Sequence, residues 1–480
     1  MPWQAVVAGL TFDRWLVAVA LALVCAAGAL MGVQSDTWWQ LRTGQLILTS
    51  GQIPTNDSFS STVRGGPWPN HEWLAQVLFA QAYAAGGLPA LWLAGAALVT
   101  LMWYGLAQLC EGPGRVRAIA LLLGLGGHSV IWSVRPHLFS LALAVAALLL
   151  LPRQRWHWLY PPLLALWANL HAGVAFGGAI VVAAWLVACA RELAGWVRSR
   201  VGAGAHAHTP TEGGWFGHPA LHWSLVALLS GLATLLNPLG AGLWWYVLSS
   251  FGDTTRTYLS EWQPPSLSWP ASYPFFILVG LTALAVIWAR KTWHGQRDWT
   301  LLALALLFGW LGFRSIRHTA FFTLAAAPLL TRPLRDWAPL PPAPRQGLVN
   351  LLLLLGLALG GAALVGSRWA DMPRAPLSPE IVAGVRACDG TLYNTYDTGG
   401  PLIWAVPERP VFVDNRQDPY PADLLFRAVI AEQRGDYQAL FAEYGVRCAL
   451  APAGQALDQA LRRAGWREVA SDVQLVVLAK

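Results

Sequence analysis

Residues 13–44 of the chain read DRWLVAVALALVCAAGALMGVQSDTWWQLRTG. The apolar part of this stretch is long enough to cross about 30 Å of hydrocarbon as a helix. It is followed at once by Asp36 and by two tryptophans, Trp38 and Trp39. A carboxylate at the end of a membrane helix is costly and calls for a structural or functional reason. We therefore expect a membrane protein whose polar chemistry begins where the chain leaves its first span.

The rest of the composition agrees with a membrane class. The 480 residues are 55% hydrophobic and 12% charged, whereas a soluble domain carries about 25% charged residues. Apolar blocks of helical length recur between short polar breaks, which favours an α-helical polytopic protein over a barrel. The sequence predicts about eleven transmembrane helices, near 13–33, 88–110, 115–133, 136–152, 156–168, 172–190, 220–236, 273–290, 298–312, 318–331 and 346–366.

Basic residues set the expected orientation, because short cytoplasmic loops are enriched in Lys and Arg. With Arg14 in the cytoplasm, the arginines of the loops near 115, 153, 191, 297 and 332 lie on the same side. Eleven spans then place the N-terminus in the cytoplasm and the C-terminus in the periplasm of a bacterial inner membrane. The net charge of +7 is explained by this topology, and no basic run indicates nucleic acid as a partner.

Charge also divides the chain into two expected domains. Residues 1–366 hold 20 basic and 11 acidic residues, and residues 367–480 hold 12 and 14. The first part is predicted to be the transmembrane domain, with external loops 34–87 and 238–272 and an interfacial helix over 71–85. The second is predicted to be a small periplasmic α/β domain with strands at 391–396, 411–414, 447–451 and 473–479 and helices near 421–443 and 455–464.

Two of the five cysteines, Cys388 and Cys448, fall in the C-terminal domain. A periplasmic location would allow them to form a disulfide, but their sequence positions leave the pairing open.

Acidic and histidine side chains gather in the first external loop. Asp36 can be a catalytic base or metal ligand beside the indoles of Trp38 and Trp39, or a helix cap beside interface anchors. Asp57, His71 and Glu72 can converge on an acceptor hydroxyl or a divalent cation, or serve as caps. Both interpretations remain open from the sequence.

Arginines at predicted external helix ends form a second group. Arg314 and Arg317 are three residues apart, so on one helix they would share a face and could grip the phosphate of an anionic lipid. Arg135 has a similar position, and snorkelling to lipid headgroups is the alternative for all three. His171 and Asn237 also interrupt apolar blocks, where packing or capping is the usual role of such residues.

The order of these motifs resembles a family of bacterial polytopic membrane proteins related to the GT-C class of glycosyltransferases. The resemblance extends over nearly the whole chain. Its motifs are Asp36-Thr-Trp-Trp with Gly44, Ile53-Pro54 with Asp57-Ser-Phe-Ser, Asn70-His-Glu-Trp-Leu74, Arg135-Pro, Asn169-Leu-His-Ala-Gly173, Asn237-Pro238, Arg314-x-x-Arg317-His, Asn394-Thr-Tyr-Asp-Thr-Gly-Gly400, and Phe412-Val-Asp-Asn-Arg416 with Tyr420.

What the resemblance implies is transfer of a sugar from a polyprenyl-phosphate donor to a glycan, lipid or protein acceptor on the periplasmic face. Asp36 matches the position of the GT-C catalytic carboxylate, and the second acidic role is left to Glu72 or Asp57, of which Glu72 is the catalytic candidate. Because only one Asp follows the first span, the resemblance does not decide whether the protein binds a metal cofactor. A divalent cation, if bound, would use Asp36, His71 and Glu72. The expected substrate and lipid-phosphate contacts are Trp38, Trp39, Arg42, Asp57, His71, Arg135, His171, Asn237, Arg314, Arg317 and His318.

Two other classes of function fit the same sequence. A transporter or flippase of a lipid-linked saccharide would need a similar groove, although no internal repeat supports it. A non-catalytic envelope scaffold would use the C-terminal domain for docking, and would tolerate amides at Asp36 and Glu72.

Overall fold

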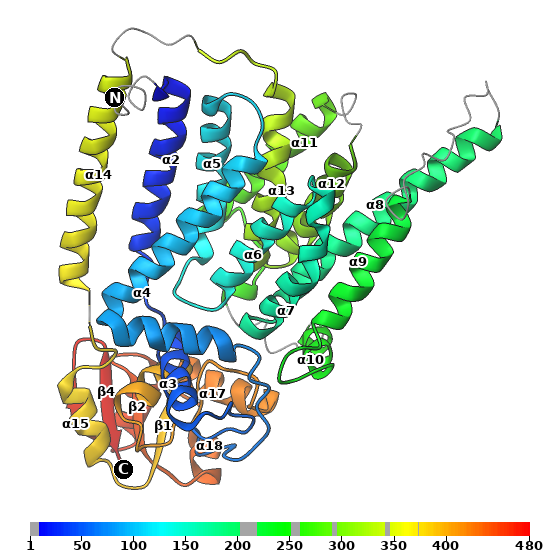
Figure 1. Cartoon of the computed structure of the whole chain (residues 1–480). Helices are drawn as coiled ribbons and strands as arrows, with labels where there is room; N and C mark the ends of the chain where they lie inside the picture. Colours follow the sequence, from blue (N-terminus) through cyan, green and yellow to red (C-terminus); the bar gives the residue numbers. More distant parts are fainter. Residues whose placement is uncertain (1–8, 202–217, 251–259, 290–294, 341–345, 373) are drawn as a thin grey trace.

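The computed structural model describes residues 9–201, 218–250, 260–289, 295–340, 346–372 and 374–480. A bundle of helices fills most of the molecule, and a mixed α/β segment closes one of its ends (Figure 1). Each of the eleven predicted spans coincides with a helix of the bundle. These helices are α2 (Phe12–Ala29), α4 (Trp73–Leu109), α5 (Gly114–His128), α6 (His137–Leu150), α7 (Tyr160–Leu170), α8 (Val174–Val201), α9 (Pro219–Ala233), α11 (Tyr273–Ala289), α12 (Gln296–Arg314), α13 (Thr319–Thr331) and α14 (Gln346–Asp371).

Within the described residues, six segments are long and apolar enough to cross a membrane: α2, α4, α8 and α14, together with α5 and α11 when each is extended by its adjoining 3₁₀ turn. The chain therefore has the features of a membrane protein. The other bundle helices are shorter or less apolar, so the expected number of eleven crossings stays a prediction.

Several basic loops meet at the end of the bundle opposite the C-terminus (Figure 1). Asp13 accepts a hydrogen bond of 2.8 Å from the backbone amide of Arg115. Glu111 forms ion pairs with Arg297, at 2.7 Å, and with Arg332. Gathering of arginine-rich loops at one end is what the positive-inside rule requires of a cytoplasmic side.

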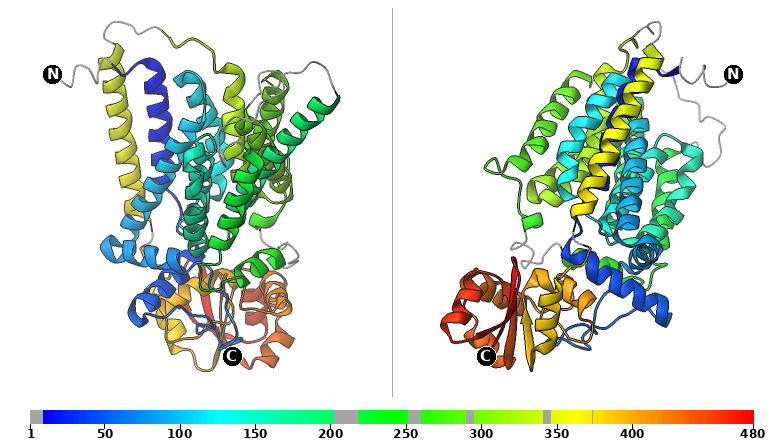
Figure 2. Two further views of the ribbon diagram at one scale, coloured as in Figure 1. Left: turned by 45° about the vertical axis from the view of Figure 1, so that its right-hand side comes forward. Right: turned by 90° about the vertical axis from the view of Figure 1, so that its left-hand side faces the viewer.

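Helix α3 (Ser35–Ser50) and the first part of helix α4 lie between the bundle and the C-terminal segment (Figures 1 and 2). Helix α3 occupies a region that the sequence suggested was loop, and it buries Trp38, Trp39 and Leu41. The first part of α4 runs to a break at Gly86 and Gly87, where Gly87 has φ 65°, a conformation that favours glycine. The break separates the predicted helix over 71–85 from the predicted span over 88–110, so both elements are confirmed as helices.

The C-terminal segment, residues 374–480, is called the tail below. It contains a four-stranded sheet in the order β1-β2-β4-β3, in which β1 and β2 are parallel and the other pairs antiparallel. The prediction of a small α/β unit is confirmed. Its elements are α15 (Pro379–Ala387), β1 (Thr391–Asn394), α16 (Gly399–Ala405), α17 (Ala422–Arg434), α18 (Gln438–Glu443), β2 (Val446–Pro452), α19 (Ala456–Arg463), β3 (Arg467–Ser471) and β4 (Leu475–Ala479).

The predicted strand at 411–414 is wrong, because this segment pairs with a distant loop instead of with the sheet. Val411 donates its backbone N–H to the Phe59 carbonyl at 3.0 Å and accepts from the Ser61 amide at 2.8 Å. The Thr62 hydroxyl donates to the Phe412 carbonyl at 2.7 Å. Residues 59–62, from the predicted first external loop, thus take the place of a neighbouring strand. Strand β3 was not predicted.

A buried ion cluster fastens the same loop to the tail. The Arg416 guanidinium lies 2.6 Å from Asp57 and 2.7 Å from Asp414, and none of these side chains is exposed to solvent. The guanidinium also lies over the ring of Trp68, 4.7 Å from its centroid. Asp57 therefore joins the loop to the tail, which is its role in the structure in place of the expected contact with substrate.

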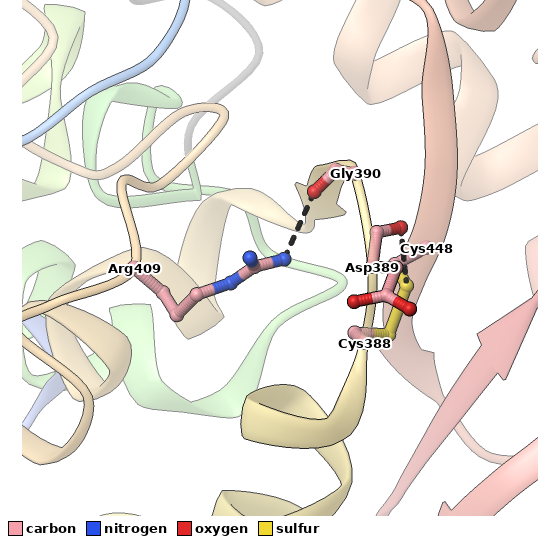
Figure 3. The surroundings of a disulfide bond; sticks show 5 residues. All are labelled: Cys388, Asp389, Gly390, Arg409 and Cys448. Carbon is pink, nitrogen blue, oxygen red and sulfur yellow. Dashed lines mark hydrogen bonds between the residues drawn. A yellow bond between two sulfur atoms is a disulfide. The ribbon is translucent and has the colours of Figure 1, made fainter.

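Cys388 and Cys448 form a disulfide with their Cα atoms 6.0 Å apart (Figure 3). The bond joins the end of α15 to β2 across 60 positions of sequence. The pairing that the sequence left open is therefore present, and a stable disulfide fits an oxidising compartment.

Loss of this disulfide is expected to destabilise the tail. Replacing both Cys388 and Cys448 by serine should lower the free energy of unfolding by about 2–4 kcal/mol, because the unfolded chain regains the entropy of an open loop. Chemical unfolding in detergent, followed by tryptophan fluorescence, measures the change. Cys189→Ser, at a free cysteine, is the control, and equal stability of all three proteins would contradict the prediction.

Candidate active site

A cavity of about 1780 Å³ lies where the bundle meets the tail. The start of α3, residues 68–72 and the loops before α6, α8 and α13 supply its bundle side. Residues 396–397, 415–418 and one face of α17 supply its tail side. Most of the candidate residues from the sequence line this one cavity.

Asp36 lies in the first turn of α3 and faces Arg135. Its carboxylate oxygen is 2.7 Å from the Arg135 Nε. The Thr37 hydroxyl donates to the Val134 carbonyl at 3.0 Å, which fixes the two segments against each other. Burial raises the pKa of Asp36 to about 6, even though the charge of Arg135 opposes the shift. At neutral pH the carboxylate is ionised but holds a proton more readily than an exposed Asp, as a general base requires.

Glu261, in the 3₁₀ turn Ser260–Trp262, bridges two arginines of the site. Its oxygens lie 3.0 Å from Arg135 Nη1 and 3.0 Å from Arg317 Nη1. Burial by itself would raise the pKa of Glu261, but the charges of Arg317 and Arg135 hold this pKa well below its usual range. The sequence interpretation missed Glu261, and its only signal was a carboxylate beside a tryptophan in a predicted external segment.

Arg314 and Arg317 do not share one helix face, so that detail of the prediction is wrong. Helix α12 ends at Arg314, Ser315 is extended with φ −159° and ψ 133°, and Arg317 begins again in the 3₁₀ turn Ile316–His318. Both arginines and His318 nevertheless line the cavity. Arg314 lies over the Trp310 ring, 5.8 Å from its centroid, and has no carboxylate partner within the part of the chain that the structure describes.

Glu72 is the centre of a second polar cluster. Gln40 donates its amide N–H to Glu72, and His71 and His171 place their Nε2 atoms 3.6 and 3.5 Å from the same carboxylate oxygen. The Nδ1 atom of His171 accepts from the Gly173 amide at 3.0 Å. Its proton is therefore on Nε2, directed towards Glu72.

The charges of this cluster follow from its contacts. Burial by itself would raise the pKa of Glu72, but the hydrogen bond and charge of His71 lower this pKa to about 2. Burial by itself would lower the pKa of His71. The hydrogen bond and the charge of Glu72 outweigh burial and raise this pKa above its ordinary value. Burial lowers the pKa of His171 to about 3. Glu72 is thus a fixed anion near neutral pH, which suits positioning better than proton transfer.

The two predicted indoles line the cavity but are largely buried. Trp38 packs on Trp404 with ring centroids 5.7 Å apart, and Trp39 packs edge-on to Trp68 at 6.1 Å. Trp38 and Trp39 therefore form part of the cavity wall.

Arg42 and Asn237 are not brought to this cavity. Arg42 lies by a separate small pocket farther along α3, where its hydrogen-bond partner is Gln45 at 3.4 Å. Asn237 shapes a turn, donating to the Thr234 carbonyl at 2.6 Å and accepting from the Leu239 amide at 2.8 Å. With Asp57, these are the three predicted contact residues that the fold holds elsewhere.

The described residues contain no group of three or more His, Cys, Asp or Glu placed to hold a metal ion. Of the suggested ligands, Asp36 is engaged by Arg135, and Glu72 by Gln40 and His71. A divalent cation therefore stays a prediction.

The tail contributes residues that the sequence analysis did not single out. Asp418 accepts a hydrogen bond from the Tyr246 hydroxyl at 3.0 Å, and the Tyr246 ring lies 4.5 Å from that of His71. Gln417 and Glu432 also line the cavity. The sequence signal for this wall was the 412–416 part of the tail motif.

No known sequence family and no curated protein sequence matches the chain. Solved structures of similar fold are found. The oligosaccharyltransferase of Archaeoglobus fulgidus in its apo form has a TM-score of 0.52 and 11% identity, over 92% of this chain and 69% of that chain. The same organism's AglB oligosaccharyltransferase in complex with an inhibitory peptide and a dolichol-phosphate has a TM-score of 0.52 and 11% identity, over 91% of this chain and 69% of that chain. The fold is thus similar to that of a GT-C class glycosyltransferase.

Proposed function

We propose that this chain is a membrane glycosyltransferase of GT-C type that transfers a sugar from a polyprenyl-phosphate donor to an acceptor on the periplasmic face of a bacterial inner membrane. The observation that carries the proposal is Asp36, an acid with a raised pKa, held against Arg135 in a cavity that is also lined by Arg314 and Arg317. Similarity to structures of oligosaccharyltransferases, one of them bound to dolichol-phosphate, supports the same class of donor.

In the proposed reaction, Asp36 accepts the proton of an acceptor hydroxyl as that oxygen attacks the anomeric carbon of the donor. The new glycosidic bond forms while the bond from the anomeric carbon to the phosphate oxygen breaks. The polyprenyl phosphate leaves with the electron pair of that bond. Proton transfer of this kind contributes about 10²–10⁴-fold to a rate.

The arginines would stabilise the departing phosphate. Arg314 has no carboxylate partner in the described residues, while Glu261 neutralises part of the charge of Arg135 and Arg317. Charge on the phosphate grows as the bond breaks, so donors that are already in place favour the transition state over the bound substrate. The adjoining apolar wall, formed by residues such as Phe176 and Leu307, suits the prenyl chain.

The membrane geometry of the proposal follows from two features. The arginine-rich loops lie at the end of the bundle away from the cavity, and the tail that covers the cavity carries a disulfide. Both favour a periplasmic site, with residues 1–366 as the transmembrane domain and 367–480 as the periplasmic domain.

The direct test is transfer of radiolabelled sugar by the purified protein in detergent or vesicles. The donors are polyprenyl phosphates that carry different sugars, and the acceptors are extracts of the cell envelope. Labelled product would support the proposal. Failure across the panel by a folded protein that binds the donor would instead favour a flippase, which vesicle assays of donor movement detect.

The reaction should depend on pH through Asp36. Its carboxylate must be deprotonated to accept a proton, so kcat/KM is expected to rise as the pH increases through about 6 and then to level off. The profile of kcat/KM for the acceptor is measured with the acceptor well below its KM, between pH 4.5 and 8. Unchanged activity down to pH 4.5 would exclude Asp36, with its raised pKa, as the base.

A further inference from the structure

The side chain of Glu261 occupies the hydrogen-bonding side of two arginines that the proposed donor phosphate needs. One of its carboxylate oxygens lies 3.0 Å from Arg135 Nη1, and the other lies 3.3 Å from Arg135 Nη2 and 3.0 Å from Arg317 Nη1. A guanidinium binds two oxygens of a phosphate with the same forked geometry. The carboxylate of Glu261 therefore makes the contacts that a phosphate would make in its place.

The other contacts of Arg135 leave little room for a second anion. Its Nε lies 2.7 Å from Asp36, and its Nη1 also donates to Gln34 Oε1 at 3.0 Å. Together with the two bonds to Glu261, each nitrogen of this guanidinium has an acceptor. The positive charges of Arg135 and Arg317 are balanced by the carboxylates of Asp36 and Glu261. A phosphate that arrives while these contacts are intact meets a cluster without net charge.

Of the two carboxylates, Glu261 is the one that can leave. Its side chain is 31% exposed, whereas that of Asp36 is 13% exposed. The Glu261 backbone is held separately, because the Ser315 hydroxyl donates to the Glu261 carbonyl at 3.0 Å and the Ile316 amide donates to the Gln263 carbonyl at 3.0 Å. Rotation of the Glu261 side chain is therefore enough to release both arginines.

Both arginines have further contacts that hold them without Glu261. Arg135 keeps Asp36 and Gln34. The guanidinium of Arg317 lies over the Trp262 ring, 5.1 Å from its centroid. The released N–H groups thus stay directed at the position that the carboxylate has left, and donors that are already in place stabilise an anion without further reorganisation.

Charge decides which anion the arginines prefer. Glu261 brings a single negative charge, whereas a phosphate monoester carries about −1.5 to −2 charges at pH 7 and offers three strong acceptor oxygens. The sugar-bearing donor is a phosphodiester with a single charge. The preference for phosphate over Glu261 therefore grows as the bond to the sugar breaks, and an interaction that strengthens in this direction lowers the reaction barrier.

We propose that Glu261 is a displaceable counter-ion of the donor site, which occupies Arg135 and Arg317 in the empty protein and yields them to the phosphate of the lipid donor. The inference rests on the proposed function, because it takes these arginines as the ones that bind the donor phosphate. It adds how that site is regulated: without donor, the two arginines are closed to anions that bind too weakly to displace the carboxylate.

Phosphate binding is measured without a sugar and without turnover. The full-length protein in detergent is titrated calorimetrically with farnesyl phosphate, and farnesol, which has the same chain without the phosphate, is the matched ligand. Glu261→Gln should bind farnesyl phosphate more tightly than wild type by about tenfold or more, because a closed population no longer lowers the apparent affinity. Its affinity for farnesol should be unchanged. Asp397→Asn, which removes a carboxylate from the tail side of the same cavity, should change the affinity for farnesyl phosphate much less.

The displacement itself is followed in wild type, so this measurement needs no variant. Carboxyl groups are coupled to an amine with a water-soluble carbodiimide, and the labelled peptides are quantified by mass spectrometry. Coupling at Glu261 should rise several-fold when farnesyl phosphate is added, because the carboxylate leaves its arginines. Asp336, whose side chain is 87% exposed, is the internal reference and should be labelled equally with and without farnesyl phosphate.

Each outcome decides between the claims. Equal or weaker binding of farnesyl phosphate by folded Glu261→Gln, an equal gain for farnesol, or coupling at Glu261 that does not rise overturns the exchange. If Glu261→Gln does not fold, the coupling result decides alone. Binding of farnesyl phosphate by neither protein overturns the exchange and removes the phosphate site from the proposed function. If the exchange is observed but no donor supports transfer, the exchange stands and the proposed glycosyltransferase activity fails.

Discussion

Replacing Asp36 by asparagine is expected to lower kcat for sugar transfer by about 10²–10⁴-fold, because the acceptor hydroxyl loses its base. The variant should still fold. The folded state raises the pKa of Asp36 from 3.8 to about 6, so the contribution of this group to stability is greatest below pH 3.8 and is lost as the pH rises through about 6. At pH 7.5 a neutral amide is therefore no worse for folding, and Arg135 keeps its pair with Glu261.

Transfer rates and melting temperatures of Asp36→Asn and wild type are compared at pH 7.5. Asp336→Asn is the matched control, since that carboxylate is 87% exposed and lies near the other end of the bundle. Full activity of Asp36→Asn would remove the carboxylate from the mechanism. A large fall in its melting temperature would show that the pair with Arg135 is structural.

Replacing Arg416 by methionine is expected to destabilise the protein by about 3–5 kcal/mol, because it leaves two buried carboxylates, Asp57 and Asp414, without a counter-charge. Arg386→Met is the matched control. Its ion pair with Glu408 is 2.7 Å long, but the side chains are 54% and 52% exposed, so its loss should cost less than about 1 kcal/mol.

Chemical unfolding followed by tryptophan fluorescence measures both Arg416→Met and Arg386→Met. The signal sums over all 28 tryptophans, and Trp68, which packs on Arg416, is the one that contributes the change at the junction. Similar small changes in the two variants would mean that the buried cluster adds nothing beyond an exposed pair.

The sequence predicted the parts of the fold that depend on local patterns. Apolar blocks of helical length predicted the places of the bundle helices. The alternation of strand-like and helical stretches in the tail predicted β1, β2 and β4. Helix α3 was not expected, because the Ser, Asp, Thr, Trp and Gly residues in 35–44 have weak helix propensity. Burial of Trp38 and Leu41 between other elements stabilises it. Val411–Asp414 has the composition of a strand, but its partner is a loop about 350 positions earlier.

The same limit applies to the site. Asp36, Glu72, His71, His171 and Arg135 were predicted by residue type at external helix ends, and the fold brings them to one cavity. Asp57 had an equally suitable residue type, yet its buried partner is Arg416, far along the chain. Glu261 was missed because its importance depends on two arginines from different segments. Residue type indicates candidates, whereas long-range pairing decides which of them meet.

The pairing of residues 59–62 with Val411 and Phe412 has a consequence for biogenesis. Residues 59–62 are synthesised before Val411 and Phe412, so with the proposed topology the loop is exported while the helices between the two segments have still to be inserted. Val411 and Phe412 would lose these backbone hydrogen bonds in a fragment that begins after the bundle. Such a fragment would expose apolar surface that the loop normally covers, and it would be a target for proteolysis. With the proposed topology, maturation therefore includes a late docking step between an early and a late exported segment, and a chain whose bundle has inserted incorrectly would not complete it.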